Sequence, residues 1–331
     1  MTSEEVSVEL KAEFLSALAQ KGETVEEIHA FARELRDLAI PLPMTDELRA
    51  GVILDVVGTG GDRLNTFNIS TTSALLVAAA GVPVAKHGNR AITSQTGSAD
   101  VLEALGIRID FSPEEAAESL RNHSFCFLFA PKYHPAFAHI APARKLCAKN
   151  GQRTIFNFLG PLLNPARPTA QLMGVPRPDL CSPMAQVLQA LGVQRGMVVC
   201  GRVDYSSEPA EGSPAYLDEL SILGDNTIAE FYHAQGFNCS TFAPKHFPLQ
   251  PATLSSLRGG DRSSNAELVR RLLSGEEKGP KRDAVLLNAG AAMFVAGKVA
   301  SIAAGWAFAA ELIDSGAASA KLQDLVAGSK A

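Results

Sequence analysis

The sequence has few of the residues that build several common kinds of functional site. Its cysteines are few and form no CxxC pair, so neither a disulfide framework nor a zinc cluster is expected: Cys126, Cys147, Cys181, Cys200 and Cys239. The seven histidines show no helical zinc-ligand spacing. One tryptophan and four tyrosines leave few platforms on which single-stranded nucleic acid could stack.

Positive charge and long apolar runs are also scarce. The chain carries 30 Lys plus Arg against 35 Asp plus Glu, a net charge of -5, so no global positive field exists to hold a nucleic-acid backbone. The uncharged stretch from Ala284 to Gly297 is shorter than the roughly 20 apolar residues that span a bilayer. The acidic start, Met1–Glu5, does not resemble a secretory signal. We therefore expect a cytoplasmic protein with no membrane span and no nucleic-acid partner.

The pattern of the 331-residue chain changes near residue 50. Before it, apolar residues recur at helical steps, with Gly22 ending one helix and a Thr24–Glu27 capping box starting another. From Val52, short apolar strands alternate with Gly-rich turns and helices. This predicts an α/β protein with a small N-terminal helical domain (1–50) and a larger α/β domain (51–331) that has a mostly parallel central sheet.

Individual elements follow from the same signals. Strands are predicted at 53–57, 82–85, 125–129 and 197–200, and helices at 70–80, 112–122, 183–191 and 264–275, the last with Ser264 as its N-cap. The polar segment 202–216 has no hydrophobic period and predicts a mobile surface loop, acting either as a lid or as an inert connection.

The segment from Asp55 to Thr71 carries the strongest chemical signal. A predicted strand leads into Gly58, Gly60 and Gly61, where missing Cβ atoms allow backbone N–H groups to approach an anion. A helix then begins near Ser70, and its free N–H groups favour phosphate. A plain glycine turn followed by an ordinary helix cap fits the same residues.

Three further segments offer charged groups. Lys86 and Arg90 follow the next predicted strand, where they could hold a polyphosphate. Arg144, on a predicted short helix, could hold a carboxylate through two hydrogen bonds or lie at the surface. The adjacent acids Asp218 and Glu219 could bind Mg²⁺ or belong to a solvated loop.

Together these motifs resemble the anthranilate phosphoribosyltransferase family. The matching stretches occur in the family's order: GTGGD (58–62), NIST (68–71), KHGNR (86–90), GSADVLEALG (97–106) and RTIFNFLGPLLNP (153–165). The resemblance implies a nucleoside phosphorylase/phosphoribosyltransferase-like fold, a homodimer, and a pentosyltransferase of tryptophan biosynthesis. Such an enzyme transfers the 5-phosphoribosyl group of phosphoribosyl pyrophosphate to the amine of anthranilate and releases pyrophosphate.

The resemblance also implies the site residues. Phosphoribosyl pyrophosphate would be bound by Gly58, Gly61, Asp62, Thr66, Asn68, Ile69, Ser70, Thr71, Lys86, His87, Gly88, Asn89, Arg90, Ser94 and Ser98. Anthranilate would be bound by Gly58, Asn89, His134, Arg144 and Pro161. The cofactor Mg²⁺ would be bound by Ser70, Asp218 and Glu219. Lys86 and Arg144 would carry the catalytic roles.

Two departures from the family pattern bear on this assignment. Cys200 stands where the family usually has His, and the stretch from there to the acidic pair is longer than usual. The rival functions are a pyrimidine nucleoside phosphorylase-like enzyme, and a non-catalytic paralogue that acts as a binding module. A nucleobase has no carboxylate for Arg144 to bind, and the phosphate loop is intact, so both rivals are disfavoured.

Overall fold

The structure is a computed structural model that describes residues 1–91, 95–204, 215–232 and 236–329. Its helices are α1 (Val8–Lys21), α2 (Val25–Asp37), α3 (Asp46–Ala50), α4 (Ile69–Ala79), α5 (Ser98–Leu105), α6 (Pro113–His123), α7 (Ala130–Tyr133), α8 (Ala141–Lys149), α9 (Phe156–Leu159), α10 (Cys181–Ala190), α11 (Arg262–Ser274), α12 (Pro280–Val295), α13 (Ile302–Asp314) and α14 (Ala317–Gly328). The strands are β1 (Leu54–Gly58), β2 (Val84–Gly88), β3 (Phe125–Phe129), β4 (Ala170–Gly174), β5 (Arg195–Val203), β6 (Ala215–Leu217), β7 (Asn226–Tyr232) and β8 (Phe237–Phe242). Short 3₁₀ turns are η1 (Pro135–His139), η2 (Gly160–Leu162), η3 (Pro178–Leu180), η4 (Pro244–His246) and η5 (Leu254–Leu257).

One sheet forms the centre of the molecule. Its strand order is β3-β2-β1-β4-β5-β7-β8, with β6 also pairing to β5. The strands from β3 to β5 are parallel to one another, whereas β6, β7 and β8 join through antiparallel pairs. The prediction of a mostly parallel central sheet in an α/β fold is therefore confirmed.

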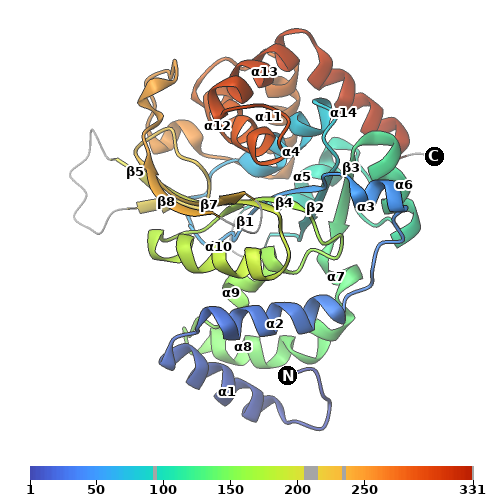
Figure 1. Ribbon diagram of the computed structural model, residues 1–331, viewed down its shortest axis with the longest axis vertical. Coiled ribbons are helices and arrows are strands. Elements are labelled where there is room, and N and C mark those ends of the chain that lie inside the picture. The colour runs from blue at the N-terminus through green and yellow to red at the C-terminus, as the bar shows by residue number, and fades with distance from the viewer. Residues whose placement is uncertain (92–94, 205–214, 233–235, 330–331) are drawn as a thin grey trace.

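Helices cover both faces of this sheet (Figure 1). On one face α4 and α11 to α14 form a thick layer in which α12, buried along most of its length, packs against α4 and α13. On the other face α10 lies against the sheet, with α2, α8 and α1 beyond it. The two faces bury separate apolar clusters, which fix the sheet and its loops from both sides.

The N-terminal helices join helices from later in the chain. α1 packs against α8, and α2 packs against α10. The helical character predicted for the first 40 residues is confirmed, while a domain boundary at residue 50 stays a prediction. Among the described residues, no helix combines the length and apolarity needed to cross a membrane.

Local signals in the sequence located many of these elements. The Thr24–Glu27 capping box is present, and Gly22 ends α1 with a φ of 85°. One cap was wrong: the N-cap of α11 is Asp261, whose side chain accepts a hydrogen bond from the N–H of Ser264, so the helix begins earlier than predicted. Residues 205–214 of the predicted surface loop lie outside the described residues.

Candidate active site

The predicted motifs meet at the edge of the sheet where the parallel strands β1, β2 and β4 end. The chain runs from β1 to β2 and β3 on one side, then returns to β4 on the other side of β1. In open α/β sheets, such a reversal leaves a crevice at the carboxyl ends of the strands, where ligands bind. Gly58 at the end of β1 pairs with Gly174 at the end of β4 at this point.

The glycine loop after β1 holds a negatively charged group. Oδ2 of Asp218 accepts hydrogen bonds from the N–H groups of Gly60 (2.5 Å) and Gly61 (3.3 Å), and from the hydroxyl of Thr59 (3.0 Å). Gly60 has a φ of 69°, a conformation that glycine adopts without strain. The loop therefore has the convergent donors of an oxyanion site.

Two glycines allow the Asp218 segment to lie directly on the strand ends. A Cβ atom added to Gly174 would overlap the carbonyl oxygen of Asp218, and one added to Gly58 would lie 3.0 Å from that oxygen. Asp218 follows β6, whose pairing with β5 delivers the acidic pair to this place. Because Gly58 and Gly174 have no side chains, the segment with Asp218 and Glu219 can lie directly on the ends of β1 and β4.

Asp62, Asp218 and Glu219 form an acidic cluster above the sheet edge. Oε1 of Glu219 accepts a hydrogen bond of 3.1 Å from the N–H of Ser70 in the first turn of α4. Burial, followed by the charge of Asp218, raises the pKa of Glu219 to about 8 and that of Asp62 to about 7. Each charge disfavours ionisation of the next, so a cation bound here would relieve the repulsion.

The ligand atoms of this cluster suit Mg²⁺. Carboxylate and hydroxyl oxygens are available, because Ser70 lies beside Glu219. No group of three or more His, Cys, Asp and Glu side chains in the described part of the chain is arranged as a metal site. Mg²⁺ in proteins commonly keeps several waters and accepts phosphate oxygens beside one or two carboxylates.

Lys86 places a buried cation beside the cluster. It is only 2% exposed, and its Nζ donates to the carbonyl oxygen of Val56 (2.5 Å) and to Oγ of Ser70 (3.4 Å). Burial lowers the pKa of Lys86, while the charges of Asp55 and Glu219 raise it. The ammonium group thus joins β1, β2 and the start of α4 at one point.

A second part of the site is aromatic and contains Arg144. The Nε2 atoms of His87 and His134 lie 3.1 Å apart, and both rings are buried. The ring of His134 packs edge-on against Phe137, which in turn packs against Phe156. The guanidinium of Arg144 lies 5.2 Å from the centre of the Phe156 ring.

The two histidine rings of this aromatic part are uncharged, and Arg144 is the cation that the structure shows beside Phe156. Burial lowers the pKa of His87 to about 3 and that of His134 to about 4, so both rings are neutral at pH 7. Within the described residues, Arg144 forms no ion pair with a carboxylate. A partly buried cation beside aromatic rings is suited to an aromatic carboxylate.

The residues after Lys86 fold over the start of α5. Oγ of Ser98 donates to the carbonyl oxygen of Asn89 (3.3 Å), and a Cβ on Gly88 would collide with that hydroxyl. The guanidinium of Arg90 pairs with Asp100 (3.1 Å) and Glu103 (2.9 Å) on α5, so it is already neutralised by carboxylates. Ser94 lies outside the described residues.

Asn68 connects the start of α4 to a residue that the sequence did not single out. Its amide donates to the carbonyl oxygen of Thr96 (3.1 Å), and its Oδ1 accepts from Asn265 (3.0 Å). Thr66, next to this segment, pairs with Arg258 as an isolated β-bridge. Ile69 and Thr71 are buried residues of the first turn of α4.

Pro161 is held by another residue that sequence reasoning missed. Nε2 of Gln171 on β4 donates to the carbonyl oxygen of Pro161 over 2.7 Å, and both residues are buried. Asn164 makes a similar contact to Asp55. Isolated buried amides give no periodic signal, so only the tertiary structure reveals these partners.

Cys200, the departure from the family pattern, lies buried in β5. Burial raises the pKa of its thiol to about 12, so the side chain is neutral and acts as a packing residue.

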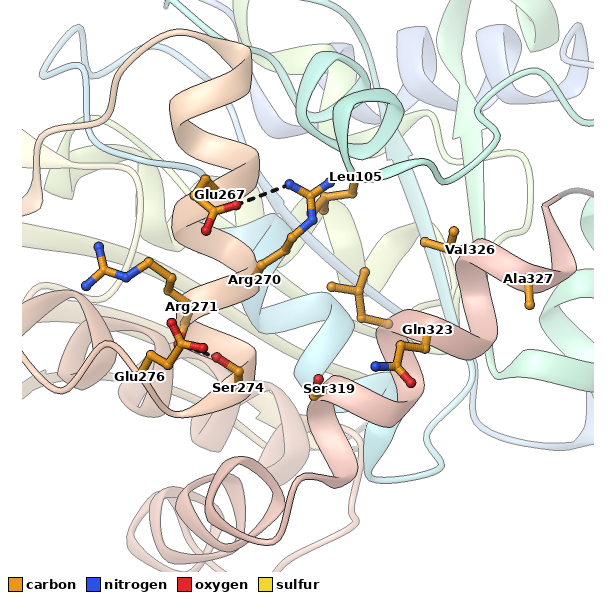
Figure 2. Close-up of a pocket in the computed structure, with 11 residues that line it drawn as sticks. Leu105, Glu267, Arg270, Arg271, Ser274, Glu276, Ser319, Gln323, Val326 and Ala327 are labelled. Carbon is orange, nitrogen blue, oxygen red and sulfur yellow. Dashed lines mark hydrogen bonds and ion pairs between the residues drawn. The ribbon is translucent and has the colours of Figure 1, made fainter.

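A groove of about 540 Å³ lies elsewhere, between α11, α14 and the end of α5 (Figure 2). It contains none of the predicted site residues. Arg270 and Arg271 on its wall pair with Glu267 (3.5 Å) and Glu277 (3.0 Å), so their charges are already compensated. The groove therefore does not compete with the strand ends as the candidate site.

Comparison with known proteins assigns the class first. The model of the glycosyl transferase family, a/b domain, matches residues 50–319. The fold and the anion-binding edge of the sheet thus belong to a glycosyl transferase.

Relatives within that class are more specific. Anthranilate phosphoribosyltransferase of Geobacter sp. strain M21 is 47% identical over 327 residues, covering 96% of this chain and 88% of the relative. The crystal structure of the Thermus thermophilus enzyme of that name is 44% identical and superposes with a TM-score of 0.85 over 99% of this chain and 92% of its own. The Saccharomyces cerevisiae enzyme in complex with PRPP and Mg is 26% identical, with a TM-score of 0.83 over 98% and 85% of the two chains. The chain belongs to the anthranilate phosphoribosyltransferase family.

We predict that Gly174→Ala damages the site without unfolding the protein. The added methyl group would push Asp218 off the strand end and break the contacts of the acidic cluster with the glycine loop and Ser70. Transferase activity should fall by at least about 100-fold, the loss typical of one displaced charge-stabilising group. Steady-state kinetics and the thermal midpoint measure both effects.

The neighbouring Met173→Leu variant, a volume-conserving change in the same strand, is the control and should keep its activity. Full activity in Gly174→Ala would show that the position of Asp218 does not matter.

Proposed function

We propose that this chain transfers the phosphoribosyl group of phosphoribosyl pyrophosphate to anthranilate at the carboxyl ends of β1, β2 and β4. One observation supports this most directly. The N–H groups of the glycine loop donate hydrogen bonds to the carboxylate of Asp218, and the buried Lys86 lies beside them. The relatives with this name cover nearly the whole chain, and one neighbour is named for its complex with PRPP and Mg.

The pyrophosphate-bearing substrate would occupy the region between the glycine loop and Lys86. The proposed contacts share this edge of the sheet or the helix starts beside it: Gly58, Gly61, Asp62, Thr66, Asn68, Ile69, Ser70, Thr71, Lys86, His87, Gly88, Asn89, Arg90, Ser94 and Ser98. Because Arg90 is paired with α5, its proposed contact would be through the backbone.

Ser70, Asp218 and Glu219 would hold Mg²⁺. The ion, when bound, would neutralise charge on the pyrophosphate oxygens as they leave. The protein's own share is to bring these oxygen ligands together at the start of α4 and to aim Lys86 and the helix N-terminus at the same place.

Anthranilate would lie in the aromatic part of the site, with Gly58, Asn89, His134 and Pro161 around it. Arg144 would bind its carboxylate through parallel hydrogen bonds. The rings of His87 and His134 are neutral at pH 7, so they add no cation that would compete with Arg144 for the carboxylate.

The chemistry asks more of the leaving group than of the nucleophile. An aromatic amine is already neutral at pH 7 and needs no strong general base. Negative charge grows on the departing pyrophosphate, so Lys86 acts where charge develops, while the loop N–H groups hold Asp218 beside it. Holding the amine near C1 of the ribose and excluding water supply the rest.

Arg144 separates this function from that of a pyrimidine nucleoside phosphorylase. A nucleobase would leave the guanidinium unpaired beside Phe156. A non-catalytic binding module, the other alternative, would not need the acidic cluster and the buried Lys86 at one edge.

We predict that Arg144→Ala raises the KM for anthranilate by about 10- to 100-fold, the range expected for a lost charged hydrogen-bond pair. The KM for phosphoribosyl pyrophosphate should stay within about threefold, because Arg144 lies in the aromatic part of the site. Lys145→Ala, an exposed change on the same helix, is the matched control. Anthranilate fluorescence follows the reaction, and an unchanged anthranilate KM would exclude this role.

A second prediction concerns the metal. The double variant Asp218→Asn with Glu219→Gln should need at least about 10-fold more Mg²⁺ for half-maximal activity, because two anionic ligands are lost. Asp225→Asn, an exposed acid in the same region, should leave the Mg²⁺ dependence unchanged. The same dependence in the double variant and the wild type would place the ion on other ligands.

We also propose that residues 1–50 form the smaller domain of a homodimer. Leu10 and Phe14 on α1 are 56% and 48% exposed, an apolar surface that a second copy could cover. Sedimentation should give a dimer for the wild type and a monomer for Leu10→Glu with Phe14→Glu. A monomeric wild type would overturn the proposed homodimer.

The cytoplasmic location expected from the sequence stays a prediction.

A further inference from the structure

β1 and β2 diverge as they approach the site. Backbone pairing joins them at one position only, Leu54 with Val84. In contrast, β1 pairs with β4, and β2 with β3, along all five residues of each strand. The backbone ladder therefore does not set the spacing between the glycine loop, which follows β1, and the Lys86–Arg90 segment, which begins in β2.

Buried side chains span this opening instead. Nδ2 of Asn164 donates to Oδ2 of Asp55 on β1 (2.8 Å) and to the carbonyl oxygen of Ala85 on β2 (2.7 Å). Asp55 is fully buried and Asn164 is 1% exposed. This amide nitrogen connects the two strands where their backbones separate, and the Nζ of Lys86, which donates to the carbonyl oxygen of Val56, is a second connection.

Asn164 is itself fixed in place. Its Oδ1 accepts a hydrogen bond of 2.9 Å from the N–H of Ala166, across Pro165, so the side chain has little freedom to turn. It enters the sheet from the turn that follows η2, the segment that carries Pro161. A buried amide with all these partners transmits its position to both strands.

One oxygen of the partner carboxylate is left unsatisfied. Oδ1 of Asp55 lacks a hydrogen-bond partner among the described residues. Burial raises the pKa of Asp55 to about 6, against the opposing effects of the Lys86 charge, the Asn164 amide and the backbone N–H groups of His87 and Val56. A buried acid with an unsatisfied oxygen is destabilising, which asks for a reason beyond packing.

We propose that Asp55 and Asn164 are positioning residues that set the distance between the glycine loop and Lys86, and so the fit of phosphoribosyl pyrophosphate. This inference rests on the proposed function. Neither residue needs to touch the substrate; each acts through the strand that carries a binding group.

Gln171 provides a matched control. Like Asn164, it is a buried amide that ties down the 160–164 turn, through its bond to the carbonyl oxygen of Pro161. Unlike the bonds of Asn164, this bond does not cross from β1 to β2. If Asn164 only stabilises the turn, substitution of either amide should change the KM for phosphoribosyl pyrophosphate equally. If Asn164 positions the strands, only its substitution should raise that KM.

The test compares Asn164→Leu with Gln171→Leu. Both variants should melt at a lower temperature than the wild type. Only Asn164→Leu should raise the KM for phosphoribosyl pyrophosphate, by at least about 10-fold, the effect of misplaced binding groups. Its KM for anthranilate should stay within about threefold. Asp55→Asn keeps an oxygen that can accept the hydrogen bond from Asn164. Its KM for phosphoribosyl pyrophosphate should therefore stay closer to the wild-type value than that of Asn164→Leu.

Calorimetric titration with pyrophosphate and Mg²⁺ gives a readout without turnover, and binding should weaken in Asn164→Leu alone. If that variant does not fold, Asn164→Ser is used instead. Its shorter polar side chain also cannot span from Asp55 to Ala85, and it places no apolar group beside the Asp55 carboxylate. Equal changes in the Asn164 and Gln171 variants, or no change in pyrophosphate affinity in either, would overturn the inference. Wild-type turnover of both substrates is measured first; its absence would count against the proposed function and not against the positioning role.

Discussion

The bond between the Asp218 carboxylate and the glycine-loop amides is the interaction on which the site depends. It joins a loop after β1 to a segment more than 150 residues later, and it needs bare glycines at the ends of β1 and β4. The loop amides are thereby held in a convergent, anion-binding arrangement. Burial and the nearby charge of Asp218 raise the pKa values of Asp62 and Glu219, and a cation bound beside these acids would relieve their repulsion.

The sheet makes this concentration of charge tolerable. The parallel strands β1, β2 and β4 end at one edge, so Lys86 reaches the same place from β2 while its stem stays buried. Helices pack against both faces, and the N–H of Ser70 at the start of α4 donates a hydrogen bond to Glu219. Charge is therefore opposed by charge or by backbone dipoles, whereas the apolar clusters on the two faces supply the burial that stabilises the fold.

Sequence patterns predicted the parts of this arrangement that are local. The capping box at Thr24, the strand at 125–129 and the glycine loop all depend on nearby residues. The N-cap of α11 was misplaced because Ser264 and Asp261 are both good caps, and the structure uses Asp261. Asn265, Gln171 and the role of Asn164 were missed because each acts on a segment distant in the chain, and a single buried amide leaves no pattern.

The same reasoning separates two kinds of residue in the site. Asp218, Glu219 and Lys86 are identified by charges gathered at one sheet edge, with Asp218 and Lys86 buried, an arrangement that is destabilising unless a ligand uses it. Asp55 and Asn164 carry no group toward the ligand, yet they stand where the backbone pairing of β1 and β2 stops. If parallel strands must part to admit a ligand, something other than their ladder has to fix how far they part. In this chain the carboxylate of Asp55 and the amide of Asn164 occupy that position, beside the ammonium group of Lys86.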